Sequence, residues 1–196
     1  MRLRCATTNP GKLREFRAAA ARLDSQVEIE PLERLRELPV PVEDGETFEQ
    51  NAVKKALHYS EYAKEPVFAD DSGLEVEALG GAPGVYSARY AGEGATDEEN
   101  NRLLVERLRG VEDRRARFVC VIALARQGEL LGVFHGAVGG RIVAEAKGKN
   151  GFGYDPHFFY EPFGCTFGEA AGERKMDVSH RGAALKLMLE WVEAQG

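Results

Sequence analysis

The stretch RFVCVIALARQGELLGVFHGAV, residues 117–138, contains two apolar segments separated by Arg126, Gln127 and Gly128. Both segments are rich in residues that favour strands, and the glycine suits a tight turn between them. The first segment is apolar on both faces, which is typical of a strand in the interior of a sheet. The sequence therefore predicts two long paired strands, with the first at the centre of a sheet.

Toward the N-terminus, predicted strands and helices alternate. Pro10 follows a candidate N-cap, Asn9, and capping-box patterns begin at Thr47 and Thr96. Alternation followed by local strand pairing predicts an α/β protein with a mixed sheet, organised as one domain over residues 1–196. The other predicted strands are 3–7, 27–32, 66–70 and 74–79, and the predicted helices are 9–23, 47–63, 96–108 and a last one from about Ser179.

Composition limits the classes of partner. The chain has 196 residues, 43% of them hydrophobic, and a formal net charge of −6, which disfavours a nucleic-acid partner because phosphates need many basic residues. Cys5, Cys120 and Cys165 match no zinc or redox spacing, so idle thiols in a reducing compartment are expected. No apolar stretch is long enough for a membrane span or a signal peptide, so we expect a cytoplasmic protein without a membrane partner.

The segment TTNPGK, Thr7–Lys12, lies at the start of a predicted helix. A helix N-terminus leaves backbone N–H groups unpaired and carries partial positive charge, so it favours a bound anion. Lys12 would add a full charge. The segment lacks the Walker pattern, and an ordinary well-capped helix with a solvent-facing lysine is the alternative interpretation.

Two adjacent aspartates, Asp70 and Asp71, follow an apolar run where a strand is predicted to stop. Successive side chains of a strand point to opposite faces, so we expect the two to have different roles. Mg²⁺ is typically held by one or two carboxylates with waters and phosphate oxygens, and a carboxylate can accept the proton of an attacking water. The alternative is that Asp70-Asp71-Ser72-Gly73 forms only a turn.

A second metal ligand is expected in the loop before residue 47. Glu43 is the candidate, although Asp44 or Glu46 could serve by chemistry. On the helix that follows, polar residues recur in a stripe in which Asn51 and Lys54 share one face. Such a stripe is usually only a solvated face.

Two later segments suit a nucleobase. The glycine-rich GKNGFGYDP, residues 148–156, presents Phe152 for stacking beside Asp155, although its glycine spacing is not the dinucleotide fingerprint. In KMDVSHRG, Lys175, His180 and Arg181 are predicted to lie at the start of the last helix, where acidic residues are more usual. Either an acceptor-rich ligand or a salt bridge to a nearby loop would explain this placement.

Together these motifs resemble the inosine triphosphate pyrophosphatase (Ham1-like) family of non-canonical purine nucleotide pyrophosphatases. The resemblance extends from about Leu3 to Leu189. It implies an elongated, two-lobed α/β fold with a nucleotide cleft between the lobes, a homodimer, and Mg²⁺-dependent hydrolysis of a nucleoside triphosphate to monophosphate and pyrophosphate. The matching segments are ATTNPGK, TFEQNAVKKA, FADDSGLEVEALGGAPGVYSARY, GFGYDP and SHRGAALKL.

The resemblance also implies roles for individual residues. Asp71 would be the catalytic proton acceptor, and Glu43 with Asp71 would bind the metal. The residues implied to bind substrate are Thr7, Thr8, Asn9, Pro10, Gly11, Lys12 and Lys54 near the phosphates, Ser72 beside the substrate, and Phe152, Gly153, Tyr154, Asp155, Lys175, His180 and Arg181 around the base.

The donors among these residues agree with an oxo-purine substrate such as ITP, dITP or XTP. A 6-oxo group accepts hydrogen bonds, whereas adenine presents an amino group there, which would leave donors such as Lys175 unpaired. Two other functions are open: a nucleotide-binding sensor without turnover, and a pyrophosphatase of the Maf-like group with another base preference. The presence of both Glu43 and Asp71 favours the enzyme.

Overall fold

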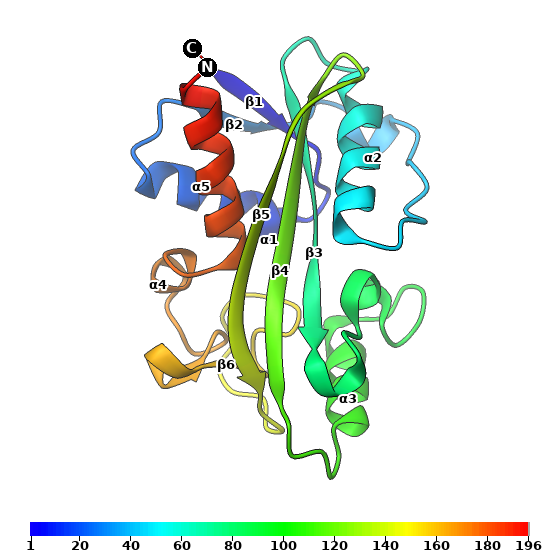
Figure 1. Cartoon of the computed structure of the whole chain (residues 1–196), viewed down its shortest axis with the longest axis vertical. Helices are drawn as coiled ribbons and strands as arrows, with labels where there is room; N and C mark the ends of the chain where they lie inside the picture. The colour runs from blue at the N-terminus through cyan, green and yellow to red at the C-terminus, as the bar shows by residue number, and fades with distance from the viewer. Residues whose placement is uncertain (196) are drawn as a thin grey trace. The chain divides into compact units, whose positions relative to one another are not determined.

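A computed structural model of the chain describes residues 1–195 (Figure 1). Four short 3-10 turns join the regular elements, among them η3 (Gly84–Arg89). The strands are β1 (Arg2–Cys5), β2 (Glu28–Pro31), β3 (Val67–Val76), β4 (Arg115–Arg126), β5 (Glu129–Ile142), β6 (Phe158–Tyr160) and β7 (Cys165–Thr166), and the helices are α1 (Pro10–Arg22), α2 (Phe48–Ser60), α3 (Asp97–Arg107), α4 (Gly172–Met176) and α5 (His180–Glu193).

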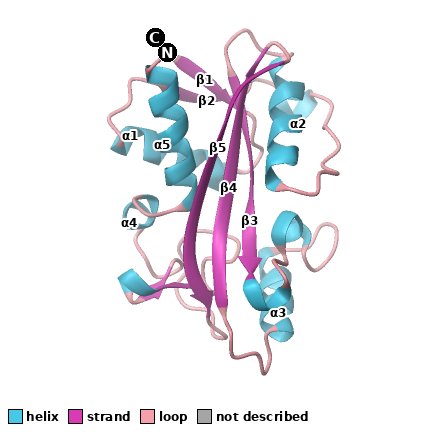
Figure 2. Ribbon diagram, viewed as in Figure 1, coloured by secondary structure: helices cyan, strands magenta, loops and turns pink. Residues whose placement is uncertain are grey.

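The strands of the described chain form one sheet of seven, in the order β2-β1-β3-β4-β5-β6-β7. β1 pairs in parallel with β2 and β3, whereas β6 pairs antiparallel with β5 and β7, so the sheet is mixed as predicted. β4 occupies the middle position, and its residues from Cys120 to Ala125 are all buried. Figure 2 shows helices flanking the strands, which confirms the α/β fold class.

Strand β3 corrects the prediction of two short strands with a break at the aspartates. Val67–Val76 is one continuous strand, and Asp70 and Asp71 lie in its interior. A turn is absent because these residues remain in the sheet, where apolar residues on both sides of them, including Phe68 and Leu74, are fully buried. Burial of such side chains outweighs the local turn preference of Asp, Ser and Gly.

The helix starts agree with the predicted caps. Asn9 caps α1, with Pro10 as its first residue, and Thr96 forms a full capping box with Glu99 at the start of α3. Thr47 caps α2, but the side chain of Gln50 returns to the N–H of Glu46 instead of that of Thr47. Ala52 and Ala56 of α2 and Leu185 and Met188 of α5 are fully buried, whereas Leu23, at the C-cap of α1, is 40% exposed.

The chain divides into two compact units. Unit 1 comprises 1–71, 120–136 and 180–196, and unit 2 comprises 72–119 and 137–179. The predicted nucleotide cleft between two lobes stays a prediction.

Each unit has its own apolar core. In unit 1, α1 packs against α5, and Phe16 meets Phe68 edge to face with ring centroids 5.3 Å apart. In unit 2, Phe118, Phe158 and Phe167 form an aromatic group, with centroid distances of 4.5 to 6.2 Å. The core of unit 2 contains Leu74, Val76, Leu104, Leu108, Ala116, Phe118, Val138, Ile142, Tyr154, Phe158 and Phe167.

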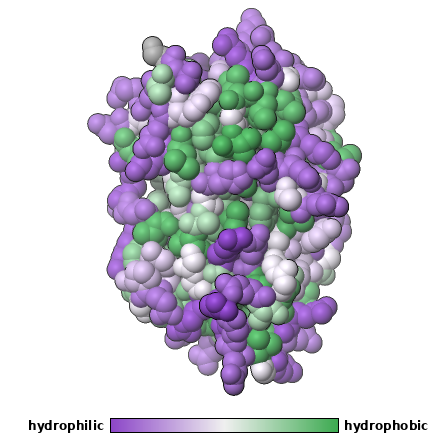
Figure 3. Space-filling model, viewed as in Figure 1, coloured by the Kyte–Doolittle hydropathy of each residue, from purple (hydrophilic) through white to green (hydrophobic). Residues whose placement is uncertain are grey.

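On the face that Figure 3 shows, hydrophilic residues are interspersed with areas where apolar residues gather. Within residues 1–195, no helix is both long enough and apolar enough to cross a membrane. All three cysteines are free thiols, as expected from their spacing, and Cys5 and Cys120 are buried.

Candidate active site

In unit 1, two carboxylates converge on the ammonium group of Lys55. Its Nζ lies 2.9 Å from Glu43 Oε2 and 3.2 Å from Asp71 Oδ1. The side chains of Lys55 and Asp71 are only 11% and 13% exposed, so this contact is well shielded from water. The structure therefore brings together Glu43 and Asp71, the two predicted metal ligands. They meet at Lys55, which was not among the predicted site residues.

Asn51 fixes the other oxygen of Asp71. Its Nδ2 donates to Asp71 Oδ2 at 3.2 Å, and its Oδ1 accepts the N–H of Gly45 at 2.8 Å. Asn51 is 1% exposed, so its amide is held in place by packing as well as by these bonds. One buried amide thus ties the loop that carries Glu43 to the strand that carries Asp71.

The neighbouring lysine, Lys54, lies elsewhere. It pairs with Asp44 on the surface, where its side chain is 47% exposed. Residues three and four apart on a helix are both neighbours, so spacing alone does not separate the two lysines. In the structure Lys55 contacts Asp71, as Asn51 does, whereas Lys54 pairs with Asp44. The exposure of Lys54 agrees with the solvated face that its place in the polar stripe indicated, and that Lys54 contacts the phosphates stays a prediction.

Asp70 occupies the opposite side of β3. Its side chain is 2% exposed and accepts a hydrogen bond of 2.7 Å from Lys12 Nζ. Arg181 lies near enough to interact electrostatically with Asp70, and its Nη1 donates to Glu15 Oε2 at 2.6 Å. The two aspartates therefore have different partners, as the alternation of a strand predicts.

Their surroundings move the two carboxyl pKa values in opposite directions. For Asp71, burial is the largest influence and raises the pKa above its ordinary value, despite the opposing lysines. For Asp70, burial also acts to raise the pKa, but Lys12, Arg181 and Lys55 together outweigh it, and the pKa is lowered. Burial acts to lower the pKa of Lys55, but the surrounding carboxylates, Asp71 foremost, raise it. Asp70 is thus a fixed anion, whereas Asp71 is the more basic of the two.

The start of α1 is already capped. Asn9 Oδ1 accepts the N–H groups of Gly11 at 2.8 Å and of Lys12 at 3.2 Å, and the Asn9 N–H donates to Thr7 Oγ1. These two helix amides are therefore not the unpaired donors that the sequence predicted, and Lys12 is not solvent-facing but paired. Thr8 and Pro10 are exposed beside them. That Thr7–Lys12 binds phosphates stays a prediction.

In unit 2, a buried ion pair supports the loop that carries Phe152. Asp155 Oδ2 accepts the N–H of Phe152 at 2.9 Å and the Nζ of Lys175 at 2.6 Å. The same Nζ lies 5.5 Å from the centroid of the Phe152 ring. Gly151 is required here because a Cβ at that position would lie 2.0 Å from Asp155 Oδ2. The predicted base-site residues Phe152, Asp155 and Lys175 are thus brought together.

The last three basic residues of the predicted site do not form one group. Lys175 lies in the separate helix α4 of unit 2, and not at the start of the last helix as the sequence predicted. His180 and Arg181 begin α5 in unit 1. There the lack of a side chain at Gly136 is needed, since its Cβ would lie 2.1 Å from the His180 carbonyl oxygen. Whether all three contact one base stays a prediction.

The glycine-rich segment after β3 supports the base loop. In η3, Ser87 Oγ accepts the N–H of Leu74 at 2.9 Å, and the Ser87 carbonyl accepts the hydroxyl of Tyr154 at 2.7 Å. Gly73 permits this approach, because a Cβ there would lie 2.3 Å from Ser87 Oγ. On strand β3, Ser72 lies between Asp71 and Gly73. The sequence indicated that this segment shapes the rim of the cleft, which stays a prediction, and only the fold shows what the segment contacts.

Comparisons with known proteins find similarity to one family over nearly the whole chain. The Ham1 family model matches residues 3–191. A dITP/XTP pyrophosphatase of Desulfotalea psychrophila is 49% identical over 180 residues, 92% of this chain and 80% of that protein, and one of Geobacter sulfurreducens is 48% identical over 198 residues, 100% and 98%. The solved structure of the Staphylococcus aureus Ham1 protein has a TM-score of 0.87 at 38% identity, with both chains covered completely.

Proposed function

Because this chain belongs to the Ham1 family, we propose that it hydrolyses non-canonical purine nucleoside triphosphates (ITP, dITP and XTP) to the monophosphate and pyrophosphate. The curated relatives are named dITP/XTP pyrophosphatases, which supports this substrate class. The observation that carries the proposal is the convergence of Glu43 and Asp71 on Lys55 in a chain that the family model matches over residues 3–191.

We further propose that Mg²⁺ is the cofactor and that Glu43 and Asp71 hold it. Among residues 1–195, no cluster of three or more metal-ligating side chains occurs, but Mg²⁺ needs only one or two carboxylates and completes its shell with water and phosphate oxygens. The pair Glu43 and Asp71 fits that requirement. When bound, the ion would neutralise charge that develops on the phosphates.

The chain's own residues supply the remaining chemistry. Asp71 would accept the proton of the attacking water, and its contacts with Asn51 and Lys55 support this role. Asn51 orients that carboxylate. Lys55 is the lysine that we assign to the phosphates in place of Lys54, and Lys12 supplies a second cation from α1.

At the base site, Phe152 would stack on the purine, and Lys175 would donate to its 6-oxo group. The ion pair with Asp155 fixes the ammonium beside the ring. An amino group in place of the oxo group would leave a donor facing a donor, which a site built on hydrogen bonds rejects. His180 and Arg181 are proposed as further donors, in keeping with their place at the start of α5.

The test is a substrate panel with identification of the phosphorus product. We expect rapid release of pyrophosphate from ITP, dITP and XTP with Mg²⁺, slow turnover of ATP and GTP, and loss of turnover on chelation. Orthophosphate as the product, or equal rates with ITP and ATP, would refute the proposal. Tight binding of ITP without turnover would favour the sensor. The homodimer is proposed from the family resemblance alone, and sedimentation of the purified chain would test it.

A further inference from the structure

We propose that Asp97 and Asn101 of helix α3 are positioning residues for the base, acting through the loop that carries Phe152. The inference rests on the proposed function of that loop and adds two residues to it. Neither side chain belongs to the motifs discussed above. Both belong to unit 2, as the loop does.

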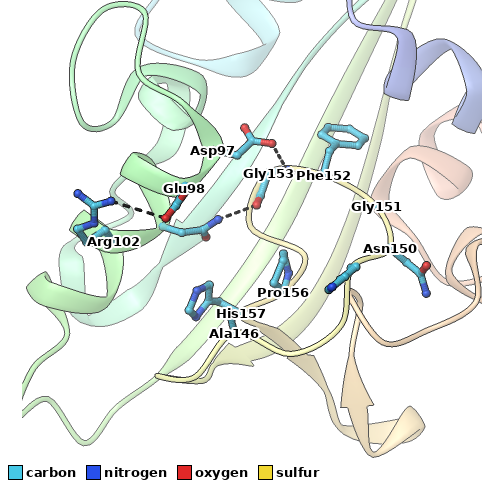
Figure 4. Close-up of a pocket in the computed structure, with 12 residues that line it drawn as sticks. Asp97, Glu98, Arg102, Ala146, Asn150, Gly151, Phe152, Gly153, Pro156 and His157 are labelled. Atoms are coloured by element: carbon cyan, nitrogen blue, oxygen red, sulfur yellow. Dashed lines mark hydrogen bonds and ion pairs between the residues drawn. The ribbon is translucent and has the colours of Figure 1, made fainter.

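Helix α3 holds both polar groups of Gly153. The Gly153 N–H donates to Asp97 Oδ2 at 2.7 Å, and Asn101 Nδ2 donates to the Gly153 carbonyl oxygen at 2.8 Å (Figure 4). Asp97 and Asn101 are four residues apart, so they lie on one face of the helix. Together they hold the residue that directly follows Phe152.

These two bonds complete a set of three around the aromatic residue. The N–H of Phe152 is held from within the loop by Asp155, while the next two peptide units are held from outside by α3. With three successive peptide units restrained, the backbone fixes the direction of the Phe152 Cα–Cβ bond, from which the ring extends. Gly153 adopts φ +60°, a left-handed conformation that other residues seldom adopt, so these contacts hold the loop in a special shape.

Helix α3 is a rigid support for these hydrogen bonds to Gly153. Thr96 and Glu99 form the capping box at the start of this helix, and Asp97 takes no part in it. Asn101 is 8% exposed, and its amide orientation is determined because a carbonyl oxygen can only accept a hydrogen bond. Asp97, Asn101 and Phe152 also line one pocket of about 420 Å³ between α3 and the loop. Helix α3 is therefore suited to keep the Phe152 loop in place while a base binds to that loop.

A purely structural interpretation is that the negative charge of Asp97 only stabilises helix α3, by its favourable interaction with the positive end of the helix dipole. Glu98 provides the matched control, since it lies in the same first turn, carries the same charge, and contacts Arg102 at 3.8 Å instead of the loop. Asp97→Asn keeps an oxygen acceptor for the Gly153 N–H and removes the charge. The two interpretations therefore predict different results for these variants.

The first experiment measures KM and kcat for ITP with the full-length chain. We expect Asp97→Ala and Asn101→Ala to raise KM about 3- to 10-fold, as befits the loss of one hydrogen bond, with kcat within about twofold of wild type. Asp97→Asn and Glu98→Ala should keep the wild-type KM. If Asp97→Asn and Glu98→Ala raise KM as much as Asp97→Ala does, the effect is the helix dipole and the inference is wrong.

The second experiment tests whether the hydrogen bonds from α3 to Gly153 affect substrate binding through the Phe152 ring. Phe152→Ala should itself raise KM, and adding Asp97→Ala to it should change KM little, because a positioning residue has nothing left to position. Independent, multiplicative effects would overturn the inference and leave the proposed function standing. An unchanged KM in Phe152→Ala alone would instead remove the base-stacking role from the proposed function. Should Asn101→Ala fail to fold, the Asp97 variants decide the outcome.

Discussion

The two units hold their functional groups in different ways. In unit 1, Glu43, Asp70 and Asp71 are held by side-chain cations, and the aspartates and lysines stand on a regular strand and helices. In unit 2, the loop with Phe152 is held mostly through its backbone, by side chains that reach its peptide groups. The first arrangement controls charge, and the second controls the position of a ring.

This difference predicts how variants in each unit should behave. A change among the charges of unit 1 leaves the backbone in place and alters the proton acceptor or the phosphate contacts, so it should reduce kcat. A change that frees the loop of unit 2 should leave the chemical groups intact and weaken binding of the base, so it should raise KM. The following predictions test that contrast, from the largest expected effect to the smallest.

Asp71→Asn should cause the largest loss. The amide keeps the size of the side chain but cannot accept the proton of the attacking water, so kcat should fall about 10²- to 10⁴-fold while ITP still binds. Steady-state kinetics and equilibrium binding of ITP measure the two effects. Asp44→Asn, on the exposed neighbour of Glu43, is the control and should behave as wild type. Wild-type turnover in Asp71→Asn would end the assigned role.

Lys55→Met and Lys54→Met distinguish two adjacent lysines. Lys55 contacts both Glu43 and Asp71, so its loss should lower kcat/KM about 10- to 100-fold, the value of one charge-assisted contact. Lys54 pairs only with Asp44 at the surface among the described contacts, so its loss should change kcat/KM less than about twofold. The ratio of the two effects, measured with ITP, is the readout. A reversed ratio would return the role to Lys54.

Gly151→Ala and Gly153→Ala compare two left-handed glycines of the same loop. Both have positive φ, 76° and 60°, so both should lose about 1 kcal/mol of stability. A Cβ at 151 would in addition collide with Asp155 Oδ2, whereas at 153 it meets no atom within 4 Å. Gly151→Ala should therefore be the less stable variant in urea unfolding and should have the higher KM. Equal behaviour of the two would show that Asp155 does not depend on this approach.

Asp113→Ala should have the smallest effect. The side-chain and backbone hydrogen bonds of Arg115 lower the pKa of this exposed carboxyl to about 2, below the value of about 3.9 in an unfolded chain. The carboxylate therefore stabilises the folded state above pH 4, and that contribution is lost as the pH falls toward 2. The difference in the free energy of unfolding between wild type and Asp113→Ala should shrink over that range, while KM and kcat stay unchanged at pH 7. A difference that grows on acidification would contradict the ion pair.

Much of the fold was predictable because the signals are local. The caps at Asn9 and Thr96 act within three residues, and the apolar run in β4 requires burial on both faces wherever it occurs. Of the site, the pair Glu43 and Asp71 and the group of Phe152, Asp155 and Lys175 were named from the sequence, and the structure brings each set together. These residues were identifiable because their chemistry, together with the family motifs, marks them.

The sequence by itself thus determined the alternation of strands and helices toward the N-terminus, the central strand, the family, and the kinds of residue that the chemistry requires. Only the tertiary structure decided that β3 continues through Asp70 and Asp71, that Lys55 and not Lys54 meets the carboxylates, and that α3 holds Gly153. The physical reason is range. Caps and periodicity depend on neighbours along the chain. The contacts of Lys55 and Gly153 join residues 16 and 56 apart, and the continuity of β3 depends on the burial of its side chains, so only the packed structure decides these three features.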